Sequence, residues 1–131
     1  DSQAKIYIDG DLKQNASIAG HNGSLANNYS LQIGMDTDLG DYSLNGRLDD
    51  ISIYNRVLSA SEVSNSMSNG VDINDQSLLA YWNCNYGFDS TLYDHSGNGN
   101  HGTIHGATWV ENIYGCTDDL AINSLKNSDR R

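Results

Sequence analysis

The chain has 131 residues, with 17 acidic against 7 basic side chains and a formal net charge of -10. This length corresponds to one ordinary domain or to part of a larger one. Such an acidic chain cannot neutralise phosphate, so neither nucleic acid nor an anionic membrane surface is expected as a partner. No apolar run approaches the roughly 18 residues that membrane insertion needs.

The composition predicts a turn-rich, all-β chain, since it has 13 glycines, no proline and many Asn, Ser and Asp residues. It has two cysteines, Cys84 and Cys116. Their spacing does not suit a structural zinc site, and both one disulfide and two free thiols remain open.

The first predicted element is a β-hairpin in residues 5–14, KIYIDGDLKQ, with its turn at Asp9-Gly10, because both residues tolerate positive φ. Residues 29–35, YSLQIGM, alternate again, with Leu31 and Ile33 on one face, and predict a third strand.

Residues 45–63, NGRLDDISIYNRVLSASEV, contain a change of period. Residues 48–54 alternate as a strand, and Ser59 with Glu62 then forms a capping box that opens a short helix, with Gly70 as its C′ residue. After a short connector, residues 78–82 (LLAYW) predict another strand. Residues 89–105 predict a Gly-rich loop, residues 103–109 a last short strand, and the end of the chain a polar tail.

These motifs resemble a known family. KIYIDG, LQIGM and NGRLDDISIYNRVLSASEV look like the C-terminal half of a laminin G-like, concanavalin A-like jelly-roll domain of the bacterial secreted type. Residues 78–110, LLAYWNCNYGFDSTLYDHSGNGNHGTIHGATWV, look like the N-terminal strands and Gly/Asn turn of the same kind of domain. The resemblance implies an all-β, two-sheet antiparallel jelly-roll sandwich with one short helix, incomplete or permuted.

The order of the two halves is inverted relative to the family, and the central strands are absent. Either the chain spans a junction between two tandem domains, or it is a reduced, circularly permuted sandwich in which residues 48–54 pair with residues 78–83. We expect that pairing, since an unpaired strand in either half would expose an edge. The expected organisation is a C-terminal half in residues 1–70, N-terminal strands packed on it in 71–113, and a tail or linker in 114–131. The incomplete core also suggests a strand-exchanged homodimer.

Enzymatic activity is not expected. Glycosidases need two carboxyl groups on one face of a sheet, about 5 to 5.5 Å apart in retaining enzymes. The chain has two Glu residues, of which Glu62 serves the capping box and Glu111 follows the last strand. The resemblance implies that a histidine of the Gly-rich loop supplies hydrogen bonds, while two of the three positions His95, His101 and His105 look unconstrained, so zinc binding is not expected.

Calcium is a better candidate than zinc, because it prefers carboxylate and carbonyl oxygens. The resemblance places a calcium ligand at the start of the last strand, which matches Asp49 with Asp50 beside it. The alternative for Asp49 is an ion pair with Arg47 or Arg56. The cluster DTDLGD at residues 36–41 does not form a helix-loop-helix calcium loop, because the twelfth position is Arg47 rather than Glu.

The remaining expected function is recognition of a ligand. The resemblance implies a non-catalytic binding or adhesion module, extracellular or at the cell surface, that takes a glycan or an extracellular protein. A short likeness of residues 114–123 to a Cys-containing repeat of bacterial surface proteins agrees with this location. Exposed aromatic rings would make the contacts, and the candidates are Tyr29, Tyr42 and Tyr86. Trp82 and Trp109 are expected to pack in the core. A structural spacer without a ligand is the alternative, followed by an accessory domain of a polysaccharide-degrading enzyme.

Overall fold

The computed structural model describes residues 3–20, 28–36, 42–85 and 89–110. In that part of the chain the strands pair antiparallel in four separate two-stranded sheets. The all-β class with one short helix is therefore confirmed, in fragmentary form. The elements are β1 (Gln3–Ile8), β2 (Asp11–Ser17), β3 (Met35–Asp36), β4 (Tyr42–Ser43), β5 (Ile51–Tyr54), α1 (Ala60–Asn69), β6 (Leu78–Trp82), β7 (Thr91–Leu92) and β8 (Gly102–Thr103).

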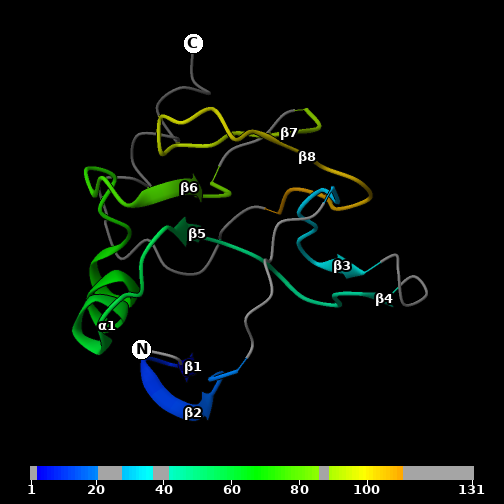
Figure 1. Cartoon of the computed structure of the whole chain (residues 1–131). Helices are drawn as coiled ribbons and strands as arrows, with labels where there is room; N and C mark the ends of the chain where they lie inside the picture. Colours follow the sequence, from blue (N-terminus) through cyan, green and yellow to red (C-terminus); the bar gives the residue numbers. More distant parts are fainter. Residues whose placement is uncertain (1–2, 21–27, 37–41, 86–88, 111–131) are drawn as a thin grey trace.

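The predicted hairpin is confirmed as β1 and β2. Asp9 and Gly10 adopt φ values of 53° and 78°, which is the pair of positive angles that a two-residue hairpin turn requires. A bulge between Ile6 and Tyr7 shifts the register. The hairpin lies below α1 (Figure 1), and a Cβ placed on Gly10 would come within 3.3 Å of the Met67 side chain.

The third predicted strand is wrong for most of its length. Of residues 29–35, only Met35 enters a strand, and it pairs across a short ladder with Ser43. Leu31, one of the two residues on the apolar face of this predicted strand, is 66% exposed. An alternating segment becomes a strand only when a neighbour accepts its hydrogen bonds, and here the neighbouring strand β4 has two residues.

The expected pairing of the two halves is observed. β5 and β6 lie side by side and antiparallel (Figure 1), with Ile51 opposite Trp82 and Ile53 opposite Ala80. β5 is shorter than the predicted 48–54, because Asp50 takes a φ of 46° and turns the backbone out of the extended conformation before Ile51. The division of the chain into two family halves and a tail stays a prediction.

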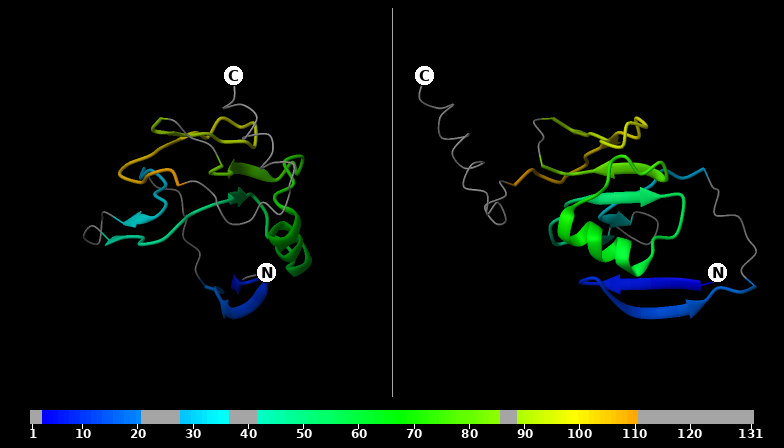
Figure 2. Two further views of the ribbon diagram at one scale, coloured as in Figure 1. Left: turned by 180° about the vertical axis from the view of Figure 1, so that it is seen from behind. Right: turned by 90° about the vertical axis from the view of Figure 1, so that its left-hand side faces the viewer.

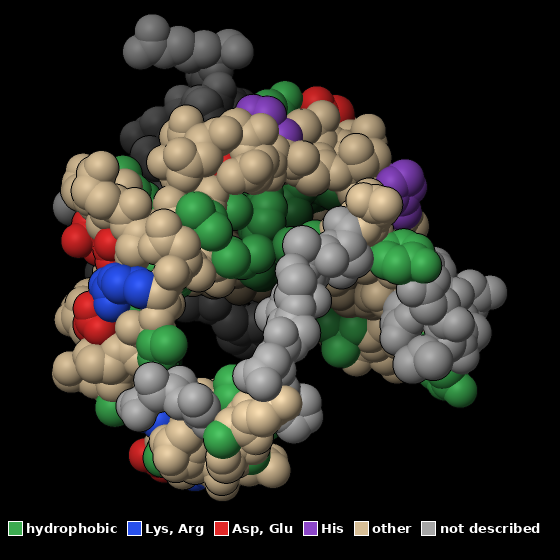
Figure 3. Space-filling model, viewed as in Figure 1, with side chains coloured by type: hydrophobic (Ala, Val, Ile, Leu, Met, Phe, Trp, Pro, Cys, Tyr) green, Lys and Arg blue, Asp and Glu red, His purple; other side chains and the backbone are tan. Residues whose placement is uncertain are grey.

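The buried apolar residues of the described segments all belong to β6, namely Leu78, Ala80 and Trp82. Apolar side chains gather on the visible face around β5 and β6 (Figure 3). Many others are exposed, including Ile6 and Ile8 of the hairpin, at 52% and 54%. The buried core of the described residues therefore lies at β6, whereas the hairpin, which lies apart from β5 and β6 in Figure 2, is largely exposed.

Helix α1 begins as predicted. The Ser59 hydroxyl accepts from the Glu62 amide at 3.3 Å, and the Glu62 carboxylate accepts from the Ser59 amide at 2.7 Å, which completes the capping box. Gly70 ends the helix with a φ of 82°, and its amide donates to the Ser66 carbonyl at 3.0 Å. Both ends of this largely exposed helix are thus fixed by local hydrogen bonds.

Arg56 connects β5 to the two segments that follow it. Its Nη2 lies 2.8 Å from a Glu62 oxygen and 2.6 Å from an Asp75 oxygen. The hydrogen bond from Arg56 is the main reason that the pKa of Glu62 falls to about 2. Hydrogen bonds from Ser77, together with Arg56, lower the pKa of Asp75 to about 2. The Arg56 guanidinium therefore links the start of α1 to the connector before β6.

Candidate functional site

The loop of residues 94–102 is organised around the buried carboxylate of Asp94, which is 8% exposed. Its Oδ1 accepts from the backbone amides of Tyr81 and Ser96, each at 2.9 Å. Its Oδ2 accepts from the Asn100 amide and the Ser96 hydroxyl, also at 2.9 Å. Burial of the carboxyl opposes ionisation, but the hydrogen bonds that it accepts lower its pKa to about 2. Asp94 is therefore an ionised support for the loop.

The same loop covers the edge of β6 that faces away from β5. The Asn98 side-chain amide donates to the Leu78 and Leu79 carbonyls at 2.9 and 3.1 Å. The Asn100 side chain donates to the Leu79 carbonyl at 2.8 Å. The buried Trp82 ring donates from Nε1 to the Asn100 carbonyl at 2.9 Å. Side-chain amides thus occupy positions that a neighbouring strand would otherwise fill.

Two histidines stabilise this loop by hydrogen bonds. His101 Nδ1 accepts from the Asp94 backbone amide at 3.0 Å, which leaves the ring hydrogen on Nε2. The His95 backbone amide donates to the Tyr81 carbonyl at 2.7 Å. Within the described ranges, no three His, Cys, Asp or Glu side chains lie close enough together to hold a metal ion. The hydrogen-bonding role predicted from the sequence is the one that these contacts describe.

Asp49 and Asp50, the residues predicted to bind calcium, lie just before β5. The Tyr81 hydroxyl donates to Asp50 Oδ1 at 2.6 Å, and the Asp50 amide donates to Asp49 Oδ1 at 3.0 Å. The ion pairs of Arg56 are formed with Glu62 and Asp75. These two carboxylates fall short of the six to eight oxygens that calcium takes. Calcium binding stays a prediction, and the absence of a rise in melting temperature with millimolar calcium would remove it.

Tyr81 and Cys84 share the electrostatic field of these two aspartates. Burial, the hydrogen bond to Asp50 and the charge of Asp49 all raise the pKa of Tyr81 above its usual range. Burial and the same two charges raise the pKa of the Cys84 thiol. A neutral thiol is a weak nucleophile, and the Cys84 Sγ donates to the Trp82 carbonyl at 3.6 Å. The other cysteine, Cys116, lies outside the described residues, so the disulfide alternative stays open.

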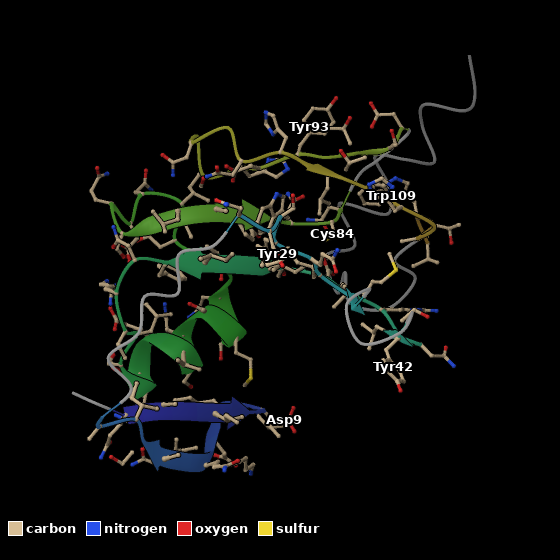
Figure 4. All side chains as sticks on the ribbon, turned by 45° about the vertical axis from the view of Figure 1, so that its right-hand side comes forward. Asp9, Tyr29, Tyr42, Cys84, Tyr93 and Trp109 are labelled. Atoms are coloured by element: carbon tan, nitrogen blue, oxygen red, sulfur yellow. The ribbon has the colours of Figure 1, made fainter. Side chains whose placement is uncertain are left out.

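The predicted aromatic contacts do not form one cluster. Tyr42 is 68% exposed and Tyr29 is 78% exposed. Figure 4 shows Tyr42 at the β3 and β4 ladder and Tyr29 at some distance from it, toward β5 and β6. Tyr86 lies outside the described residues. Trp82 is buried as expected, whereas Trp109 is only partly buried and donates from Nε1 to the Asp89 carbonyl at 3.3 Å.

Asp94 is the residue that sequence reasoning missed. The signal that could have found it is its place at the head of the turn DHSGNGNHG, where a carboxylate precedes several amides in a tight loop. The glycines account for the backbone conformation of the turn, but they do not reveal the carboxylate that holds the turn in place. The predicted binding residues and the hydrogen-bond network around Asp94 are therefore in different parts of the chain.

The comparison with protein families gives one result. The model of the concanavalin A-like lectin/glucanases superfamily, in its laminin G-like form, matches residues 1–64. Residues 1–64 are therefore similar to a domain of this superfamily. The match covers β1 to β5 and the start of α1, which is the stretch whose motifs resemble the C-terminal half of such a domain. Searches of the curated proteins and of the solved structures found no match to the chain.

Laminin G-like domains are often binding modules, are generally not catalytic and are typically extracellular. The likeness of residues 78–110 to the opposite end of the domain stays a prediction, since the match ends at residue 64. The one helix in the described part of the chain has 10 residues, too few for the roughly 20 that cross a bilayer.

Proposed function

We propose that this chain is a non-catalytic binding or adhesion module of a secreted or cell-surface protein, and that it recognises a carbohydrate or an extracellular protein. The observation that carries the proposal is the exposed ring of Tyr42 on β4. This ring projects from a ladder that the Leu44 amide extends by donating to the Gly34 carbonyl at 2.8 Å. A large ring fixed on paired backbone can stack on a sugar ring or pack on a protein at a low entropic cost.

The roles of the carboxylates support a module without catalysis. Glu62 is held by the helix cap and by Arg56, and Asp94 is enclosed by the donors of its own loop. Asp50 accepts the Tyr81 hydroxyl. Each of these groups is engaged in holding structure, whereas a hydrolytic pair needs one free acid and one free base or nucleophile facing the substrate.

The test is retention on immobilised polysaccharides and a glycan array, followed by titration of any ligand found. Replacing Tyr42 by Ala should weaken binding about tenfold, which corresponds to roughly 1.4 kcal/mol. Tyr42→Phe keeps the ring and should keep most of the affinity. Tyr93→Ala removes another half-exposed ring, on the far side of β6, and should leave binding unchanged.

Binding to an extracellular protein and not to any glycan would assign the protein class of ligand. Binding of neither class by the folded chain would refute the proposal and favour the structural spacer. Equal binding by the wild-type chain and Tyr42→Ala would show that Tyr42 does not carry recognition.

A further inference from the structure

We infer that Asn45 is a site of spontaneous covalent modification, where the Asn45-Gly46 peptide deamidates to aspartate and isoaspartate with water as the co-reactant. The inference does not depend on ligand recognition. It rests on the contacts that distinguish this pair from the other Asn-Gly pairs of the described segments, Asn69-Gly70 and Asn98-Gly99. A further pair, Asn22-Gly23, lies outside those segments.

A glycine after asparagine favours this reaction, because the attacking nitrogen belongs to the following residue and glycine has no Cβ to obstruct the approach or restrict the backbone. The Gly46 amide nitrogen gives up its proton to solvent and attacks Asn45 Cγ. The bond from Cγ to Nδ2 breaks, ammonia leaves, and a cyclic succinimide remains. Water then opens the ring at Cγ to give aspartate, or at the main-chain carbonyl carbon to give isoaspartate. Water is consumed and ammonia released, with no oxidation or reduction.

Asn45 and Gly46 are both exposed on the link between β4 and β5 (Figure 1). In the described part of the chain, neither the Asn45 side chain nor the Gly46 amide takes part in a hydrogen bond. The residue before them is held, since the Leu44 amide donates to the Gly34 carbonyl at 2.8 Å. The Asn45 carboxamide and the attacking nitrogen can therefore approach each other without breaking a hydrogen bond.

The pair Asn69-Gly70 is held by the C-terminal end of α1. The Asn69 side chain donates to Asn65 Oδ1 at 2.7 Å. The Gly70 amide, which would be the attacking group, donates to the Ser66 carbonyl at 3.0 Å. Both bonds must open before the ring can close, so conversion at Asn69 requires local unfolding of the helix end.

The pair Asn98-Gly99 is held by the cover over β6. The Asn98 Nδ2 group, which would leave as ammonia, donates to the Leu78 and Leu79 carbonyls at 2.9 and 3.1 Å. Ring closure would draw the carboxamide away from these acceptors. An aspartate at this position would also place a negative charge against two carbonyl oxygens, which is unfavourable. The same dipeptide is thus protected in α1 and in the loop, and unprotected at Asn45.

The test incubates the full chain at mildly alkaline pH in heavy-oxygen water and follows it by peptide mass spectrometry. Oxygen taken up from the solvent marks conversion during the incubation, and fragment ions assign it to a single residue. In the folded chain, Asn45 should convert roughly tenfold faster than Asn69 and Asn98, which corresponds to about 1.4 kcal/mol of local opening. In concentrated urea the three should convert at similar rates, since each precedes a glycine.

Gly46→Ala is the matched variant. A Cβ placed on Gly46 would meet the Leu44 side chain at 3.5 Å, an ordinary contact, and Gly46 does not have a positive φ, so the variant should fold like the parent chain. The added Cβ should slow conversion at Asn45 several-fold and leave Asn69 and Asn98 unchanged. Equal conversion of the three residues in the folded chain, an undiminished preference for Asn45 in urea, or no slowing by Gly46→Ala would each overturn the inference.

Discussion

Replacement of Asp94 by Asn tests whether one buried carboxylate supports the loop that covers β6. Asn keeps the size and one carbonyl oxygen, which can still accept from the amides of Tyr81 and Ser96. The other oxygen becomes an NH2 group that faces the Asn100 amide, now 2.9 Å from an acceptor. Two donors then oppose each other at a buried position.

The expected loss follows from these contacts. The Asn100 amide and the Ser96 hydroxyl both lose the charged oxygen to which they donate. The hydroxyl can rotate to accept from the new NH2 group, but the Asn100 amide is left without a partner, which costs about 1 to 3 kcal/mol. The bonds that survive become neutral and weaker. Together they predict a fall of about 2 to 4 kcal/mol in the free energy of unfolding. Asp72→Asn is the matched control: Asp72 is exposed, and its Oδ1 accepts from the Asn74 amide at 2.9 Å, a bond that Asn can keep.

Urea unfolding followed by tryptophan fluorescence measures both variants, because the buried Trp82 donates to the carbonyl of Asn100 in the same loop. Asp72→Asn should stay within about 0.5 kcal/mol of the parent chain. If Asp94→Asn unfolds at the same urea concentration as Asp72→Asn, Asp94 does not support the loop and the reasoning fails.

Two further predictions concern the pH dependence of stability and the cap of helix α1. The pKa of Asp94 is about 2 in the folded chain and about 3.9 when unfolded, so its contribution is complete above about pH 5 and is lost as the pH falls toward 2. In chemical unfolding, Asp94 should account for about 1 to 2 kcal/mol of the stability lost across this range after solvent screening, in addition to the losses at Glu62 and Asp75. A slope unchanged in Asp94→Asn would contradict this assignment. Ser59→Ala removes the hydroxyl cap of α1 and should cost about 1 kcal/mol, read from thermal unfolding. Ser64→Ala, inside the same helix, should be neutral or slightly stabilising, and an equal loss at both positions would argue against the cap.

The parts of the fold that could be predicted are those fixed by neighbouring residues. Asp9-Gly10 specifies its turn, Ser59 and Glu62 specify the start of α1, and LLAYW forms a strand with the predicted bounds. The segment at residues 29–35 has a strand pattern but obtains almost no partner, because pairing depends on residues far along the chain. A sequence period cannot show which edges will be available.

The candidate site could likewise be predicted only in part from the sequence. The exposure of Tyr42 agrees with its selection as a candidate contact ring, although it lies in the short strand β4. The role of Asp94 depends on contact with Tyr81, 13 residues earlier, and therefore on how the loop folds back over β6. The positive φ of Asp50, which shortens β5, likewise has no signal in the alternating pattern.

The cover on β6 also has a consequence for how the protein behaves at high concentration. A sheet with two uncovered edges can add strands at both and grow into a fibre. Here side-chain amides from the Gly/Asn loop close one edge of the β5–β6 sheet to strand addition. Opening that loop, as Asp94→Asn should do, would expose this edge of β6 and make the chain more prone to aggregate through it.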